Sequence, residues 1–290
     1  MKFFGILSGF RYLGILKIAK EREAISMKII EPRLIIVCMS IIIGLPFTYF
    51  VEARVDPETA VGIWLFDKAK VDTVEDISGK GNDGIVRNPP KWIDGKFDKA
   101  VEFAGSGQKI EVPDSDSLNF GQESFSVVVW FNFKASPNWS RLVRERTPSP
   151  WGSGNLGWEL QTQGVQIHWS LDDKAGHHKK TTYANGGNGE WRHTAMIVNR
   201  DKKKLITYLD GEDEKSVDIA DIGDVTDVQP VTIGGGITGA LDEIGIFNVA
   251  LTVDDVVDIM KLGLTEVLGG AAVSPSVKLA TTWGRVKYGK

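Results

Sequence analysis

Apolar and polar residues alternate with a period of two along several short segments, and this pattern restricts the chain to a fold built mostly of β-strands. Ser124–Phe133 shows the pattern best. Its two faces hold Phe125, Val127, Val129, Phe131 and Phe133 on one side, and Ser126, Val128, Trp130 and Asn132 on the other. Since both faces carry large apolar side chains, the segment is expected to be a central strand covered on both sides.

Clusters of Gly, Asn and Asp separate the other alternating segments, which include Val165–Leu171 and Trp191–Ile197. Leu205–Leu209 runs into an Asp-Gly pair, a hairpin signal because Gly tolerates the positive φ that tight turns need. Strands of this length and spacing predict an all-β antiparallel β-sandwich. One short helix is expected from Thr252, whose hydroxyl can cap the first amides, and it is expected to pack on the edge of the sandwich.

Ala240–Leu251, with the sequence ALDEIGIFNVAL, resembles the closing strand of laminin G-like (concanavalin A-like) jelly-roll domains. Other segments resemble the same family in the same order, namely Val61–Asp67, Asp76–Gly84, Ala100–Ala104 with Ile110–Asp114, Phe125–Trp130, and Trp191–Ala195 with Tyr208–Gly211. The resemblance extends over residues 58–262. It implies an antiparallel jelly-roll β-sandwich that serves as a binding module in a bacterial exported protein.

The N-terminal residues 1–53 are interpreted as an export signal. Leu34–Phe50 is an apolar run preceded by basic residues, and small residues at the end of the signal place cleavage after Ala53. Met27 opens a complete signal by itself, which makes residues 1–26 a candidate upstream mis-start. An uncleaved membrane anchor is the alternative, since the run is marginally long enough to span a bilayer.

The rest of the chain is expected to be one domain, residues 54–264, followed by a linker and C-terminal tail, residues 265–290. The expected location is secreted, periplasmic or on the cell surface, with no membrane association once the signal is removed. The chain has a net charge of −4, and removal of the signal makes it more acidic, which argues against nucleic-acid binding. Its one cysteine, Cys38, lies within the signal, so the mature domain has no disulfide.

Two acidic clusters are candidate calcium ligands, because calcium prefers carboxylate, amide and carbonyl oxygens. Asp76, Asn82 and Asp83 lie in a Gly-rich loop, and Asp242 and Glu243 lie in the closing segment. The family resemblance implies that the first and last strands are neighbours, so both clusters could meet at one structural ion. The alternative is that the aspartates fix turns by accepting hydrogen bonds from backbone amides.

Loop tryptophans are candidates for ligand binding, because carbohydrate modules stack sugar rings on exposed aromatic side chains. Trp139 and Trp151 lie in loop-like sequences, and with Arg141 and Asp172 they are expected to line a groove for a glycan or an acidic polymer. Folding back of these rings as caps on the sandwich is the alternative. Tryptophans within alternating segments are expected in the core, namely Trp64, Trp130, Trp158, Trp169 and Trp191.

Catalytic motifs are missing from the sequence. Jelly-roll glycoside hydrolases carry a signature that resembles E-x-D-x-E, which places carboxylates on one face of a strand, and this chain has no such triplet. The expected function is therefore a non-catalytic exported module that recognises carbohydrate or extracellular glycan, with calcium as its only candidate cofactor. A structural or adhesive surface protein that contacts other proteins is the alternative, and a polysaccharide-active enzyme is the third.

Overall fold

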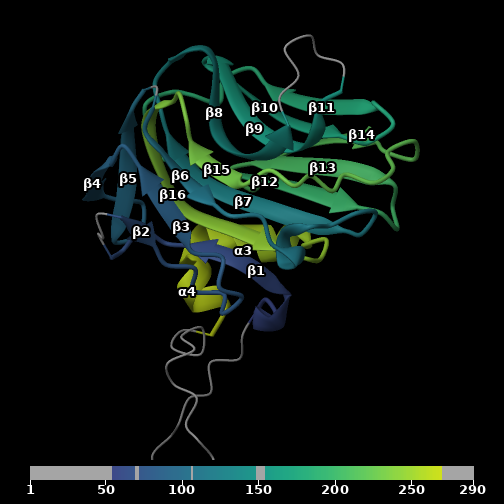
Figure 1. Cartoon of the computed structure of the whole chain (residues 1–290), viewed down its shortest axis with the longest axis horizontal. Coiled ribbons are helices and arrows are strands. Elements are labelled where there is room, and N and C mark those ends of the chain that lie inside the picture. Colours follow the sequence, from purple (N-terminus) through teal and green to yellow (C-terminus); the bar gives the residue numbers. More distant parts are fainter. Residues whose placement is uncertain (1–53, 69–71, 106, 148–153, 270–290) are drawn as a thin grey trace, which may run out of the picture. The chain divides into compact units, whose positions relative to one another are not determined.

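The computed structural model describes residues 54–68, 72–105, 107–147 and 154–269 (Figure 1). The chain divides into two compact units, Met1–Phe50 and Val51–Lys290, and all described residues belong to the second unit. The expected export signal, Trp151 and the tail beyond residue 269 lie outside the described residues. In the described part of the chain, no helix has both the length and the apolar character that crossing a membrane requires.

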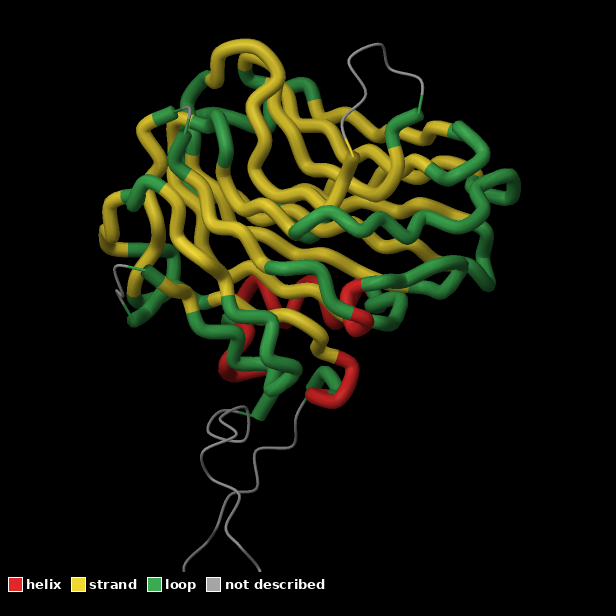
Figure 2. Tube along the Cα trace, viewed as in Figure 1, coloured by secondary structure: helices red, strands yellow, loops and turns green. Residues whose placement is uncertain are grey.

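Strands form two antiparallel sheets of eight strands each (Figure 2). The first sheet consists of β1 (Ala60–Trp64), β4 (Lys91–Asp94), β5 (Lys99–Ala104), β7 (Phe125–Asn132), β12 (Arg192–Asn199), β13 (Lys204–Leu209), β14 (Asp213–Asp218) and β16 (Thr238–Phe247). The second sheet consists of β2 (Thr73–Val74), β3 (Gly84–Arg87), β6 (Lys109–Val112), β8 (Ser136–Thr147), β9 (Leu156–Gly164), β10 (Gln166–Asp172), β11 (His178–Tyr183) and β15 (Val231–Gly234).

The order of strands in the first sheet is β14-β13-β12-β7-β16-β5-β4, with β1 pairing β16, and in the second β11-β10-β9-β8-β15-β6-β3-β2. Two short 3-10 turns are present: Pro57–Thr59 precedes β1, and Asp116–Leu118 connects β6 and β7. The all-β class and the antiparallel pairing are therefore confirmed. The jelly-roll order of connections stays a prediction.

The main core lies between the two sheets and contains side chains from both. Strand β7 supplies Phe125, Val127, Val129 and Phe131 to this core, while Val128 on its opposite face joins a second cluster. The two-sided burial predicted for this strand is confirmed. Trp64, Trp158 and Trp169 are fully buried, as expected, and Trp130 is buried as well. Trp191 differs, because it lies just before β12 and is only half-buried.

The predicted helix is α3 (Val253–Leu262), and a single turn, α4 (Leu264–Val267), follows it. Thr252 caps α3 as expected, in a reciprocal capping box with Asp255. The helix does not pack on the sandwich edge. Its apolar residues Val256 and Ile259 are buried in the second cluster, with side chains from β1, β7, β12, β13 and β16, so both helices cover the outer face of the first sheet (Figure 1).

Residues after the expected domain end at 264 also contribute to this cluster. Val267 and Leu268 are fully buried, and the carbonyl oxygen of Val267 accepts hydrogen bonds from the amides of Arg54 and Val55. The start of the described chain is therefore attached to its last helical turn.

Substitutions on the buried and exposed sides of α3 test how much the packing of this helix stabilises the fold. Ile259→Ala should lower the free energy of unfolding by about 3 kcal/mol, because it empties a buried site. Val253→Ala is the matched control, since Val253 is 44% exposed on the same helix, and it should change the value by less than about 0.5 kcal/mol. Urea unfolding measures both. Equal small effects would show that the helix only rests on the surface.

Candidate functional site

The outer face of the second sheet carries a cluster of charged side chains. Neighbouring residues in a strand point to opposite faces, so Glu159 lies outside while Trp158 and Leu160 on either side of it enter the core. Arg144 pairs with Glu159 across β8 and β9. We call the set of Arg141, Arg144, Arg146, Glu159, His168 and Asp172 the arginine–carboxylate face.

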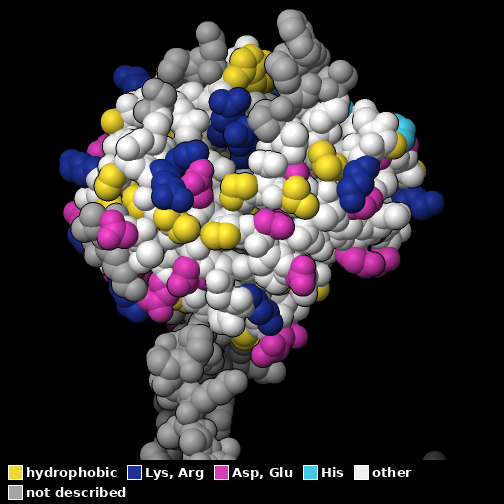
Figure 3. Space-filling view, in the orientation of Figure 1, with side chains coloured by type: hydrophobic (Ala, Val, Ile, Leu, Met, Phe, Trp, Pro, Cys, Tyr) yellow, Lys and Arg dark blue, Asp and Glu magenta, His cyan; other side chains and the backbone are white. Residues whose placement is uncertain are grey.

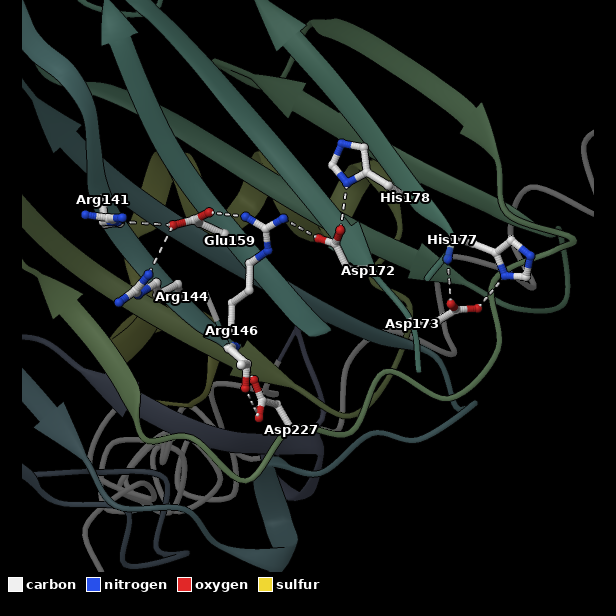
Figure 4. A network of polar contacts seen from close by, with 10 residues as sticks. Arg141, Arg144, Arg146, Glu159, Asp172, Asp173, His177, His178 and Asp227 are labelled. Carbon is white, nitrogen blue, oxygen red and sulfur yellow. Dashed lines mark hydrogen bonds and ion pairs between the residues drawn. The ribbon is translucent and has the colours of Figure 1, made fainter. Parts of the chain in front are cut away.

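Glu159 is the centre of this face, and three guanidinium groups surround its buried carboxylate (Figure 4). Arg146 Nη1 donates to Glu159 Oε2 at 2.6 Å. The other oxygen, Oε1, lies 3.6 Å from Arg141 Nε and 3.7 Å from Arg144 Nη1. These two distances are longer than an N–H···O hydrogen bond. Only Arg146 is therefore bonded tightly to the carboxylate.

Arg146 also joins Glu159 to the next carboxylate along the sheet. Its Nη2 lies 2.8 Å from Asp172 Oδ2, and Asp172 Oδ1 lies 2.8 Å from His178 Nδ1. Arg146 and Asp172 are both buried, with side chains 10% and 4% exposed. Because each of their charges has a close partner of opposite sign, this part of the network stabilises the sheet rather than offering free groups to a ligand.

Two aspartates fix the chain at the borders of the network. Asp227 accepts hydrogen bonds from the backbone amide and the hydroxyl of Thr147 at the end of β8. Asp173 accepts from the amides of His177 and Gly223, and its carboxylate lies 2.8 Å from His177 Nδ1. Both carboxylates therefore position the ends of β8 and β10.

Trp139 lies beside the arginine–carboxylate face in β8 and is 42% exposed. Its φ angle is 45°, in the left-handed region that bulky residues rarely adopt, and the pairing of β8 with β9 shifts register between Ser136 and Ser140. The indole ring lies 5.5 Å from the imidazole of His168. The irregular backbone thus keeps a large aromatic ring at the surface.

Several buried polar atoms on the arginine–carboxylate face have no hydrogen-bond partner within the described part of the chain. They are His168 Nε2, which lies near the Trp139 ring, and Ser170 Oγ, Arg141 Nε, Arg146 Nε and Asp172 Oδ2. His168 Nδ1 lies 2.8 Å from Thr182 Oγ1, and burial, with Lys180 nearby, lowers the pKa of the imidazole. A neutral imidazole can donate or accept according to its tautomer. The face therefore holds more hydrogen-bonding capacity than the protein itself uses.

The structure brings together some of the predicted ligand-binding residues. Arg141 and Asp172 belong to one network, and Trp139 lies next to it, while Trp151 is outside the described residues. Sequence reasoning missed Glu159 and His168. Their signal was present, because each stands between buried apolar residues of an alternating strand and so must face outward.

The first cluster of expected calcium ligands fixes a turn. Asp76 accepts hydrogen bonds from the amides of Ile63, Ser78 and Asn82 and from the Ser78 hydroxyl. Asp83 Oδ1 accepts from the amide of Asp76, and the Asn82 side chain donates to the carbonyl oxygen of Val61. The carboxylate oxygens of Asp76 are thus engaged by the protein, as the turn-fixing alternative describes.

The second cluster is buried in the closing strand. Asp242 accepts from the amides of Lys96, Phe97 and Glu243, and Glu243 accepts from the amide of Leu264 at the start of α4. The expected convergence of both clusters on one ion is not seen. No group of three or more His, Cys, Asp or Glu residues in the described ranges is placed to hold a metal ion. Calcium binding stays a prediction that this geometry does not favour.

Burial makes Asp242 and Glu243 unusual acids. It raises the pKa of Asp242 to about 7 and that of Glu243 to about 8, although the hydrogen bonds that the carboxylates accept from backbone amides lower both pKa values. Glu243 has a φ angle of 46° where the register of β16 against β7 shifts. The β-bulge therefore lies at two adjacent carboxyl groups that are both buried.

The sequence model of the family described as "Clostridium neurotoxin, N-terminal receptor binding" matches residues 71–250. The chain belongs to this family. Among curated relatives, the non-toxic nonhemagglutinin type E of Clostridium botulinum is 22% identical over 182 residues, which is 61% of this chain and 15% of that protein. The type A protein of the same species is 23% identical over 149 residues, which is 51% of this chain and 12% of that protein. The chain thus spans only 12–15% of the length of these curated relatives.

Solved structures share the fold. The binding domain of Paraclostridial Mosquitocidal Protein 1 has a TM-score of 0.59 at 18% identity, covering 70% of this chain and 52% of that chain. The ligand-binding domain of botulinum neurotoxin serotype D, in complex with N-acetylneuraminic acid, has a TM-score of 0.57 at 20% identity, covering 72% and 52%. At these identities the likeness establishes the fold alone.

The laminin G-like identification is wrong, because the clostridial family matches residues 71–250, which contain most of the segments on which it rested. Those segments describe strands and turns. Asp76 closes a tight turn and Ala240–Leu251 begins in the central strand β16, and such features recur in unrelated two-sheet proteins. The prediction that the chain is not an enzyme agrees with membership of a receptor-binding family.

Removal of the Asp76 carboxylate separates its structural role from a calcium role. Asp76→Ala leaves three backbone amides without an acceptor, so the free energy of unfolding should fall by about 3 kcal/mol or more. Asp94→Ala is the control, since that exposed carboxylate pairs only with Lys99. Thermal melting with and without a chelator measures the effect. A loss of stability that appears only when calcium is present would support a calcium site at Asp76 instead.

The raised pKa values of Asp242 and Glu243 predict that stability falls as pH rises. Each carboxyl stays protonated in the fold to about pH 7 or 8, whereas it ionises near pH 4 when unfolded. The stabilising contribution of each carboxyl is present at low pH. It is lost as the pH rises from the unfolded pKa to the folded pKa, at about 1 kcal/mol per pH unit for each group. His193 has the opposite effect on stability at lower pH. Because burial lowers its pKa to about 3, its contribution to stability increases as the pH rises.

Urea unfolding between pH 7 and 8.5 tests this, because folded His193 is neutral there and unfolded His193, with an ordinary pKa of about 6.5, is mostly neutral as well. Glu243→Gln keeps an acceptor for the Leu264 amide and should reduce the fall in stability. Glu266→Gln, at an exposed position in α4, is the control. A fall of the same size in Glu243→Gln and in the original chain would count against the raised pKa.

Proposed function

We propose that the domain is a non-catalytic binding module that recognises carbohydrate through the arginine–carboxylate face and Trp139. The observation that carries the proposal is the exposed indole of Trp139, held on a left-handed backbone beside polar atoms that lack partners. Residues in sparsely populated backbone regions cluster at binding sites, where the surrounding structure holds them in place.

Sugars match the chemistry of this face. A pyranose ring has an apolar side that packs on an indole, and its hydroxyl groups both donate and accept hydrogen bonds. His168 and Ser170 offer groups of the same double character, and Gln161, which pairs with His168 across the sheet, adds an amide. Figure 3 shows basic and acidic side chains interspersed on the face of the molecule that is in view.

The relatives support a receptor-binding role. The matched family is described by receptor binding, and one of the similar solved structures holds N-acetylneuraminic acid. This chain covers 52% of that structure, so glycan binding by the chain itself is our proposal. Its partner would be a glycan, alone or on an extracellular protein.

Contact with proteins alone has less support. Large apolar side chains that are exposed in the described ranges are scattered: Trp139, Val165 and Val228 lie on separate segments, and Val253 and Leu262 lie at opposite ends of α3. Interfaces between proteins use contiguous apolar areas.

Export is part of the same proposal, since a receptor glycan would be met outside the cell. N-terminal sequencing of secreted material should begin at Arg54 or within a few residues of it. Retention of the full-length chain in the cytoplasm would contradict export.

Trp139→Ala should weaken binding to an oligosaccharide roughly tenfold or more, because the ring supplies the stacking surface. An oligosaccharide array identifies the strongest probe for the original domain, and calorimetry with that probe compares the variants. Val228→Ala is the control, since Val228 is the most exposed of the large apolar residues at 72%. Melting temperature should be nearly the same in all three proteins. Undiminished binding by Trp139→Ala would place the site elsewhere.

A further inference from the structure

A pocket is lined by residues of β1, of the 3-10 turn Asp116–Leu118 and of the segment just before β7, and it shares no residue with the arginine–carboxylate face. Its volume is about 450 Å³. Small-molecule sites in proteins commonly measure roughly 300–1,000 Å³, so the pocket is large enough for a small organic ligand. Val61 and Phe120 give it an apolar wall, and Lys80, Asp116 and Glu123 give it charged groups.

Polar contacts fix two sides of this pocket. The buried Asn82 side chain donates to the carbonyl oxygen of Val61 and to Ser117 Oγ, which attaches β1 to the 3-10 turn. On another side, the Arg200 guanidinium donates to the carbonyl oxygen of Gly121 and to two carbonyl oxygens in the loop that follows β14. Because these bonds already hold the walls in place, a ligand that enters has little ordering of the protein to offset.

The polar groups that the pocket leaves unused are acceptors. Within the described part of the chain, the side chains of Asp116 and Glu123 form neither an ion pair nor a hydrogen bond. Glu123 lies near enough to Arg200 to interact electrostatically, but that guanidinium donates its hydrogen bonds to backbone carbonyl oxygens. Asn119, also in the lining, has a buried side-chain oxygen with no hydrogen-bond partner in the same ranges. The pocket therefore favours a ligand that donates hydrogen bonds.

The charges of the lining favour a cation. Among the described residues that line the pocket, Asp116 and Glu123 are acidic and Lys80 is basic. The ammonium group of Lys80 lies 3.6 Å from Glu58 Oε2, and Glu58 does not line the pocket. Lys80 thus has its own counter-ion, whereas the two carboxylates do not.

We propose that this pocket binds a linear alkyl diamine or polyamine, with an ammonium group at each of Asp116 and Glu123 and the methylene chain along the apolar wall. Ammonium groups form charge-assisted hydrogen bonds with carboxylates, and methylene groups gain free energy when they leave water for an apolar surface. A lysine side chain has the same chemistry but carries one ammonium group, so it would engage only one of the carboxylates. The proposal is independent of carbohydrate binding.

A series of diamines tests the proposal. Calorimetry with the full chain compares diaminopropane, putrescine, cadaverine and hexanediamine with butylamine and butanediol. One chain length should bind best, because two fixed carboxylates suit one separation of the ammonium groups. That diamine should bind at least tenfold more tightly than butylamine, since the second ammonium group adds a charge-assisted contact. Butanediol has no charge and should bind more weakly than either.

Asp116→Asn and Glu123→Gln should each weaken binding of the best diamine about tenfold and remove most of its advantage over butylamine. Asp94→Asn is the matched control, because it removes an equal charge from an exposed side chain outside the pocket, and it should leave the affinity nearly unchanged. Lys80→Gln removes the like charge and should strengthen binding about threefold. Damage to the fold would not produce that gain.

Failure of every diamine to bind would overturn the proposal. Equal affinities for the diamines and butylamine would overturn the contact with two carboxylates. A loss in Asp94→Asn as large as in Asp116→Asn and Glu123→Gln would show general attraction to an acidic protein instead of a site in the pocket. Tighter binding of a short lysine-containing peptide than of any diamine would overturn the polyamine as the ligand. None of these results would decide whether the domain binds carbohydrate.

Discussion

Burial of β7 on both faces is the constraint on which the rest of the structure depends. One face of the strand fills the core between the two sheets, and the other packs with α3 and α4. A central strand covered on both sides must be apolar on both sides, and Phe125–Phe133 meets that requirement. Because the helices occupy the outer face of the first sheet, the outer face of the second sheet is left free to carry polar groups.

The polar groups of that second face divide into two kinds. Arg146 and Asp172 have close partners of opposite charge, whereas Arg141 Nε and His168 Nε2 have no hydrogen-bond partner within the described part of the chain. Unpartnered groups are costly in a folded protein unless a ligand supplies the missing bonds. This division is why we attribute binding to the margin of the network near Trp139 rather than to its centre.

Particular residues show why the expected sites were only partly right. Arg141 and Asp172 belong to one network only through Glu159 and Arg146, and this depends on β8 and β10 lying on the two sides of β9, as the strand order shows. Asp76 and Asp242 were expected to meet at an ion. Each instead accepts amide hydrogen bonds from its own neighbourhood, a choice that residue type does not reveal because a carboxylate suits both roles.

The sequence by itself determined the all-β class, the antiparallel pairing, the two-sided burial of β7 and the capped helix α3, since each follows from local periodicity or turn chemistry. The family was not determined by the motifs, because turns such as that of Asp76 recur in unrelated two-sheet proteins. Only the tertiary structure decided which face α3 covers, which carboxylates are buried, and which arginine is bonded tightly to Glu159. Those outcomes depend on contacts between residues far apart in the chain, such as Arg146 with Asp172 and Lys96 with Asp242, and no local pattern records them.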